Sequence, residues 1–123
     1  MLSQFNRFNN TVSVTSNPNN IQDFAKFAAA VINHQLIAEP TSRQMWTAQK
    51  RADGELSKNG LGVFVSGDGK RLKVYHSGSQ QETRTRMVLY PNQRHGVVVM
   101  CNTYHANCGD ISTAIYRAIG SEE

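Results

Sequence analysis

The most constraining feature of the sequence is a run of apolar residues near its C-terminal end, Gly96-Val97-Val98-Val99-Met100-Cys101. The run is almost continuously apolar and carries no polar alternation, which favours a strand that is buried on both of its faces. Residues 97–101 are therefore expected in the middle of a sheet that other elements cover on each side.

The remaining secondary structure follows from caps, turn signals and apolar spacing. Asn17-Pro18 is typical of a helix start, and the apolar face that follows predicts a helix ending near Asn33-His34. Residues 1–16 are rich in Asn, Ser and Thr and are expected to form a loop. A second, short helix is expected from Glu39 to Trp46, with the Trp46 ring packed at the edge of the core. Strands are expected at residues 60–65, 72–76, 84–90 and 97–101, and a last helix at residues 110–119.

These elements predict an α+β fold. An antiparallel sheet of about four strands should carry two N-terminal helices and a C-terminal helix packed on the sheet. At 123 residues, the chain should be a single domain or a fragment of one, residues 1–123.

Charge and hydropathy argue against several partners. The formal net charge is +4, but the basic residues are scattered rather than clustered, so no nucleic acid partner is expected. A weaker alternative is an anionic surface or nucleic acid bound through a set of four cations. No run approaches the roughly 18 apolar residues that cross a membrane. The chain would be periplasmic or secreted if a signal lies upstream, and otherwise cytoplasmic. The four cations are Arg71, Lys73, Arg84 and Arg86.

Two cysteines stand seven positions apart near the end of the chain. Cys101 and Cys108 can form a disulfide in an oxidising compartment or remain two thiols. With His105 they make three zinc-type ligands, but a fourth is not evident. No metal and no cofactor are therefore expected.

A polar stretch, His76-Ser77-Gly78-Ser79, follows the strand expected at residues 72–76. Two apolar strands and an amphipathic helix come after it. This order resembles the C-terminal part of the serine β-lactamase and penicillin-binding-protein fold, in particular its class C-like branch of esterases and peptidases. The segment Asp23-Phe24-Ala25-Lys26-Phe27 resembles a helical pattern of the same family, and it lies in the expected order before the polar stretch.

The resemblance implies a role for each residue of the polar stretch. His76 would help to bind a substrate carboxylate or polarise the site, and the Ser77 hydroxyl would contact the same group. Gly78 would let the backbone pass close to a ligand. Ser79 would lend its backbone N–H to an oxyanion hole. The alternative is that the four residues are only a strand end and a turn.

The other catalytic motifs of that family are missing from this sequence. None of its serines is followed by Lys at the third position, so the Ser-x-x-Lys nucleophile is absent. Tyr90-Pro91-Asn92 follows the His-Ser-Gly strand instead of preceding it, and is interpreted as a turn. The chain is thus expected to be the C-terminal portion of a hydrolase of amide or ester bonds, of the β-lactam or D-Ala peptide type, inactive by itself. The alternative is a non-catalytic binding or assembly module.

A final expectation concerns partners. If the N-terminal part of such a fold is missing, the strand from Val97 to Cys101 would expose one apolar edge. A second copy of the chain, or a complementary chain, is expected to pair with that edge. A small-molecule or peptide substrate is expected only if an N-terminal part completes the site.

Overall fold

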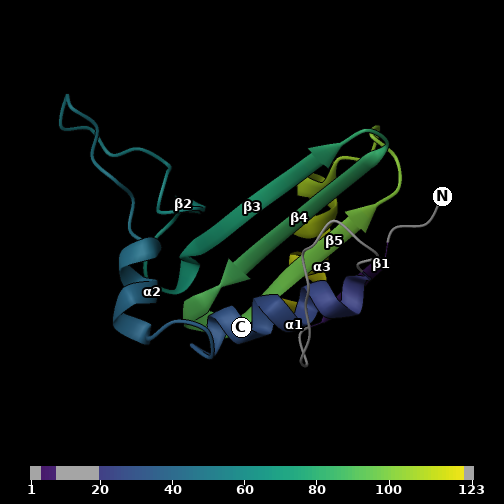
Figure 1. Ribbon diagram of the computed structural model, residues 1–123, viewed down its shortest axis with the longest axis horizontal. Helices are drawn as coiled ribbons and strands as arrows, with labels where there is room; N and C mark the ends of the chain where they lie inside the picture. Colours follow the sequence, from purple (N-terminus) through teal and green to yellow (C-terminus); the bar gives the residue numbers. More distant parts are fainter. Residues whose placement is uncertain (1–3, 8–19, 121–123) are drawn as a thin grey trace.

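Three layers make up the fold, with helix α1 on one face of a five-stranded antiparallel sheet and helix α3 on the other (Figure 1). The computed structural model describes residues 4–7 and 20–120 of the chain. The elements, in chain order, are β1 (Gln4–Arg7), α1 (Ile21–Ile32), α2 (Glu39–Met45), β2 (Phe64–Ser66), the 3₁₀ turn η1 (Gly69–Arg71), β3 (Lys73–Gln80), β4 (Thr83–Tyr90), the 3₁₀ turn η2 (Pro91–Gln93), β5 (His95–Cys101) and α3 (Cys108–Gly120). The expected α+β class is confirmed.

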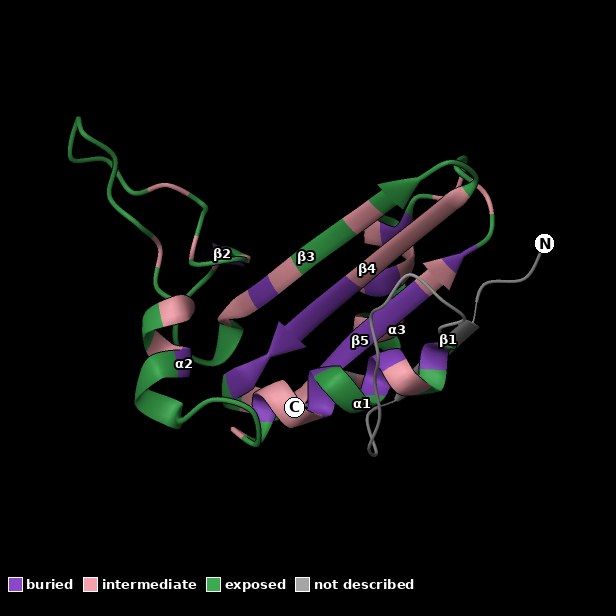
Figure 2. Ribbon diagram, in the orientation of Figure 1, coloured by how far each residue is buried: buried purple, intermediate pink, exposed green. Residues whose placement is uncertain are grey.

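Strand β5 lies inside the sheet, as its sequence predicts. The strand order is β1-β5-β4-β3-β2, so β5 has a partner on each side. Its residues Val97, Val98 and Val99 are completely buried. Because successive side chains of a strand point to opposite faces, Val98 packs against α1 while Val97 and Val99 pack against α3. Figure 2 shows the buried residues running along β4 and β5.

The outer edge of β5 is not exposed, which corrects the prediction that residues 97–101 need a partner from another chain. Strand β1 pairs with β5 in antiparallel register, from Gln4 opposite Met100 to Arg7 opposite Val97. Residues 1–16 were expected to be a loop, and for residues 4–7 that prediction was wrong. The short polar segment forms a strand because the β5 edge offers it a ladder of backbone hydrogen bonds, which depends little on side-chain type.

Helix α1 begins later than its sequence suggested. Asn20 is the N-cap, and its side-chain oxygen accepts a hydrogen bond of 2.8 Å from the Asp23 N–H. The predicted cap at Asn17-Pro18 lies outside the described residues. The helix ends at Ile32 with Asn33 as C-cap, as predicted, and α2 also has the predicted bounds to within one residue. The Trp46 side chain is buried in the core on this side.

Two strands differ from their predicted limits. Strand β2 starts at Phe64 rather than at residue 60. Strand β3 continues to Gln80, so the stretch predicted as a strand end and turn lies within a strand. The chain reverses at residues 81–82, where Glu82 has a φ of 60°. Within the described part of the chain, no helix is long and apolar enough to cross a membrane.

Candidate functional site

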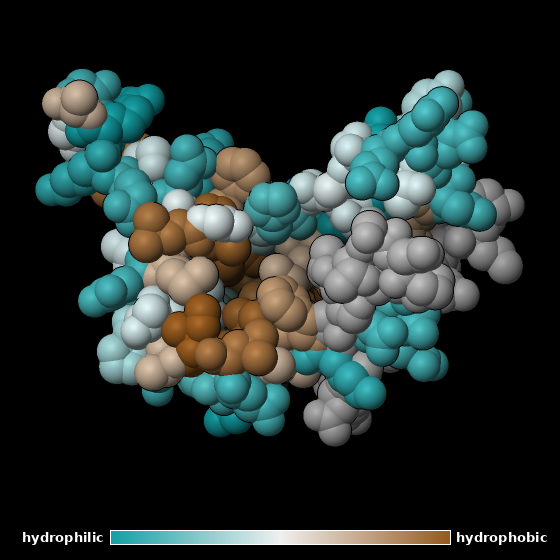
Figure 3. All heavy atoms as spheres, in the orientation of Figure 1, coloured by the Kyte–Doolittle hydropathy of each residue, from teal (hydrophilic) through white to brown (hydrophobic). Residues whose placement is uncertain are grey.

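An apolar groove opens on the α1 face of the sheet, between α1, α2 and β3. Its volume is about 510 Å³. Apolar side chains gather in a patch at the centre of the surface seen from this side, with hydrophilic side chains around it (Figure 3). The residues that line the groove are Phe24, Phe27, Val31, Leu36, Ile37, Ser42, Met45, Trp46, Leu61, Gly62, Val63, His76, Gly78, Thr85, Met87 and Leu89.

Strand β3 contributes two of its polar-stretch residues to this groove. His76 and Gly78 line it, together with Thr85, which lies opposite Gly78 on β4. The alternation of side chains along a strand sends Ser77 to the other face of the sheet. There its hydroxyl accepts a hydrogen bond of 2.8 Å from Arg86 Nη1. The structure thus brings His76 and Gly78 together and separates the Ser77 hydroxyl from them.

The outer edge of β3 is only partly covered. Strand β2 pairs with Lys73, Val74 and Tyr75, and no described strand pairs with β3 on that side from His76 onward. Ser79 lies in this part of β3, opposite Arg84 of β4, and is exposed. The exposed His76 ring stacks on Phe64 of β2, with ring centroids 6.0 Å apart. Phe64 therefore restricts the orientation of the imidazole beside the groove.

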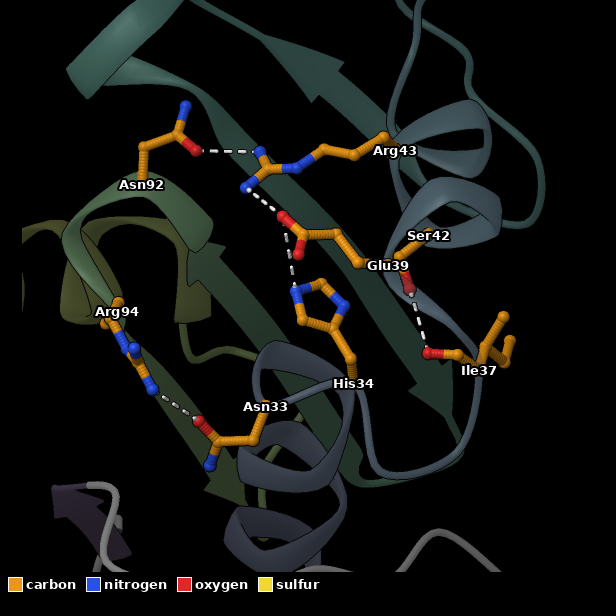
Figure 4. A network of polar contacts seen from close by, with 8 residues as sticks. All are labelled: Asn33, His34, Ile37, Glu39, Ser42, Arg43, Asn92 and Arg94. Carbon is orange, nitrogen blue, oxygen red and sulfur yellow. Dashed lines mark hydrogen bonds and ion pairs between the residues drawn. The ribbon is translucent and has the colours of Figure 1, made fainter.

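A polar network fixes the helix α2 that forms the far wall of the groove (Figure 4). Arg43 Nη1 donates a hydrogen bond of 2.7 Å to Asn92 Oδ1 in η2, and Arg43 Nη2 lies 3.6 Å from the Glu39 carboxylate. His34 Nε2 approaches the same carboxylate at 4.0 Å. Since Arg43 is on α2 and Asn92 lies in η2 between β4 and β5, these contacts link α2 to the end of the sheet.

The opposite face of the sheet carries cations next to an aromatic ring. The Arg86 guanidinium lies 4.6 Å from the Tyr75 ring centroid, and Lys73 Nζ lies 5.1 Å from it. Burial, assisted by the charge of Arg86, lowers the pKa of Lys73. Of the other two cations in the predicted set, Arg84 donates to the Gln80 carbonyl and Arg71 lies in η1. None of these four cations lines the groove.

The two cysteines lie together where β5 ends and α3 begins. Cys108 Sγ donates to Cys101 Sγ at 3.3 Å, and both residues are buried. Burial, together with the hydrogen bond to Cys101, raises the pKa of the Cys108 thiol. Among the described residues, no group of three or more His, Cys, Asp or Glu residues could hold a metal ion.

The groove itself could not be predicted from sequence motifs. Leu36, Ile37 and Leu61 lie outside the regular elements, yet they are large apolar residues that remain 40–57% exposed at its rim. The available signal was Leu36 and Ile37, two large apolar residues in the loop expected between the two N-terminal helices. Leu61 gave no such signal, because residues 60–65 were expected to form a strand.

The fold is shared with solved penicillin-binding-protein homologues. The octameric penicillin-binding protein homologue from Pyrococcus abyssi matches with a TM-score of 0.67 and 21% identity over 83% of this chain and 24% of that chain. The penicillin-binding protein from Bacillus halodurans matches with a TM-score of 0.63 and 22% identity over 79% of this chain and 29% of that chain.

A structure of SurE with D-Leu has the same arrangement, with a TM-score of 0.59 and 19% identity over 85% of this chain and 26% of that chain. At such identities the likeness is one of fold. The chain spans only about a quarter of the length of these three solved proteins. No protein-family model matches the chain, and neither does any curated protein.

Proposed function

We propose that this chain is the C-terminal portion of a β-lactamase-like or penicillin-binding-protein-like hydrolase of amide or ester bonds. In this proposal it contributes one wall of the active site, formed by β3, and does not carry the nucleophile. The observation that carries the proposal is that His76 and Gly78 line a large groove beside an open stretch of the β3 edge, in a fold shared with penicillin-binding-protein homologues.

The geometry supports some residue roles better than others. His76 is exposed at the groove, where its imidazole can donate a hydrogen bond to a substrate carboxylate or carbonyl oxygen. Gly78 keeps side-chain atoms away from the same space. Ser77 is less suited to contact a ligand in the groove, because its hydroxyl accepts from Arg86 on the other face. Ser79 remains a proposed backbone donor for an oxyanion at the β3 edge.

The function can be tested by supplying the missing part. The chain alone is expected to turn over neither a chromogenic cephalosporin nor a nitrophenyl ester, because the sequence has no Ser-x-x-Lys. Production together with the polypeptide encoded directly upstream of the Met1 codon should restore turnover. His76→Ala should then lower kcat/KM roughly 10- to 100-fold, since hydrogen bonds to charged groups contribute about 1.5–3 kcal/mol.

Ser77→Ala is the matched control on the same strand, and it should change kcat/KM little. Saturable turnover by the chain alone, abolished by Ser77→Ala or Ser79→Ala, would contradict the proposal and reveal a nucleophile within this chain. A reconstituted hydrolase that is insensitive to His76→Ala would remove the proposed role of β3.

A second candidate function is a non-catalytic binding or assembly module. The apolar lining of the groove favours it. Of the 16 lining residues, four have side chains that can form hydrogen bonds, and they are His76, Ser42, Thr85 and Trp46. This candidate predicts that the chain binds a protein partner and that no hydrolysis accompanies binding.

A further inference from the structure

The buried thiols of Cys101 and Cys108 are nucleophilic groups that the proposed hydrolase site does not use. Cys101 is the last residue of β5, and Cys108 is the first residue of α3. Both are present as thiols, and they are only 2% and 7% exposed. Their sulfur atoms lie 3.3 Å apart, so a disulfide bond of about 2.05 Å needs them only about 1.3 Å closer. Rotation about the Cα–Cβ bonds is enough to move a sulfur atom by this distance.

We propose that Cys101 and Cys108 form a disulfide that fastens the start of α3 to the end of β5. The bond forms where a disulfide oxidant is present and stays open where thiols are kept reduced. This inference is independent of the proposed hydrolase function, because neither cysteine lines the groove. It selects one of the two states that the sequence allows for the pair.

The first turn of α3 holds Cys108 in place beside Cys101. The Asn107 side-chain oxygen accepts a hydrogen bond of 3.1 Å from the Asp110 N–H, and the Asn107 carbonyl accepts one of 3.1 Å from the Ile111 N–H. Because Asn107 directly precedes Cys108, these bonds fix the backbone from which the Cys108 side chain projects. Cys101 is fixed by the β4–β5 ladder. Two thiols on fixed backbones lose little further conformational freedom when they form a bond.

The bond should stabilise the side of the molecule that α3 covers. Val97 and Val99 of β5 are buried on this side. Residues 102–107 connect β5 to α3, and most of them are exposed. A disulfide closes residues 101–108 into a ring, which removes extended conformations of this connection from the unfolded chain. The start of α3 should gain most, since a helix end next to an exposed loop opens locally more easily than a buried strand.

The reaction is a thiol–disulfide exchange with glutathione disulfide as the oxidant. The Cys108 thiolate attacks one sulfur of glutathione disulfide, and one glutathione leaves as a thiolate. The Cys101 thiolate then attacks the Cys108 sulfur of the mixed disulfide and expels the second glutathione. The two cysteines together lose two electrons and two protons, and glutathione disulfide takes up both to become two glutathione thiols. Cys108 reacts first because it is the more exposed of the two.

Burial should make this exchange slow in the folded, reduced chain. Burial, together with the hydrogen bond to Cys101, raises the pKa of the Cys108 thiol, whereas the thiolate is the form that attacks. The bond is therefore expected to form readily during folding, when both thiols are accessible, and slowly afterwards. The same burial should protect the closed bond from reductants.

The test uses the whole 123-residue chain, unfolded in urea with a reductant and then refolded with or without a glutathione redox mixture. Refolding in the mixture should give a chain that is lighter by two hydrogen atoms in intact mass spectrometry, with a peptide map that joins Cys101 to Cys108. The Tm of this chain should exceed that of the reduced chain by roughly 5–10 °C. Hydrogen exchange should become slower at the amides from Ile111 to Ile115 and stay unchanged in α1.

Cys108→Ala is the matched control, because it removes one of the two sulfur atoms. The Tm of this variant should not respond to the glutathione mixture. Comparison of the oxidised and reduced forms of the unsubstituted chain needs no variant, so the test holds even if Cys108→Ala does not fold.

Several results would overturn the proposal. Two thiols that still react with iodoacetamide after refolding in the mixture would show that the pair does not close. A glutathione adduct on Cys108 as the final product, or a disulfide-linked dimer, would show that the sulfur atoms choose other partners. A zinc ion retained by the reduced chain and released on oxidation would assign the pair to a metal site. Closure without a rise in Tm or slower exchange in α3 would remove the stabilising role of the bond.

Discussion

Gly78 approaches the neighbouring strand too closely to accept a larger residue. A Cβ atom at this position would collide with Thr85 Oγ1 across the β3–β4 pair. Overpacking of this kind costs about 1–3 kcal/mol, so Gly78→Ala should lower the free energy of unfolding by that amount. Urea denaturation of Gly78→Ala, of Thr85→Ala and of the variant with both substitutions measures these changes in the free energy of unfolding.

The Thr85→Ala background supplies the control for this prediction. With the Thr85 hydroxyl removed, Gly78→Ala should lose most of its effect, which gives a coupling energy between the two positions. Strictly additive losses in the two single variants would contradict the close contact and assign the effect to backbone conformation instead.

At this scale the structure corrects the local geometry that the sequence predicted for the polar stretch. His76-Ser77-Gly78-Ser79 is polar and carries a glycine, features typical of a turn. In the structure the same residues lie within a continuous antiparallel ladder, because β4 is long enough to pair with β3 from Val74, opposite Leu89, to Gln80, opposite Thr83. The length of β4 determines that these residues extend β3 instead of forming a turn. Local composition does not reveal the length of a partner strand.

Helix α1 is capped three positions after the Asn17 cap that its sequence predicted. Asn17, Asn19 and Asn20 all precede the apolar face, and Asn20 is the residue whose side chain accepts the Asp23 N–H. Asn20→Ala should therefore lower the free energy of unfolding by about 1 kcal/mol, the typical loss for a helix cap. Asn20→Asp keeps an acceptor oxygen at the cap and should preserve stability. Thermal unfolding of the two variants would refute the assignment if Asn20→Ala were as stable as Asn20→Asp.

Among the elements, periodicity predicted the helices and the central strands well. The apolar stripe of α3 packs Ile111, Ile115 and Ile119 against β5, and the valines of β5 are buried as their sequence indicates. Strand β1 was missed because its four residues, Gln-Phe-Asn-Arg, carry little strand signal. Pairing with an edge that lies more than 80 positions away in the sequence is a long-range property, which local patterns cannot provide.

For the whole molecule, the position of the groove was the part that the sequence did not predict. Its walls come from α1, from the segment that joins α1 to α2, from α2, from residues 61–63 and from the two strands β3 and β4. Each wall contributes apolar residues that are unremarkable in isolation. Of the polar stretch on strand β3, His76 and Gly78 line the groove.

The pairing of β1 with β5 should protect the molecule from self-association through its sheet. Deletion of residues 1–7 removes β1, so the β5 backbone groups that point away from β4 lose their partners along Val97 to Met100. An uncovered apolar edge pairs readily with another chain. We therefore expect faster hydrogen exchange at these β5 amides and concentration-dependent association by light scattering. Deletion of residues 121–123, which removes no described strand, should have neither effect. If the shortened chain stays monomeric with β5 exchange unchanged, then β1 contributes nothing to the protection of this edge.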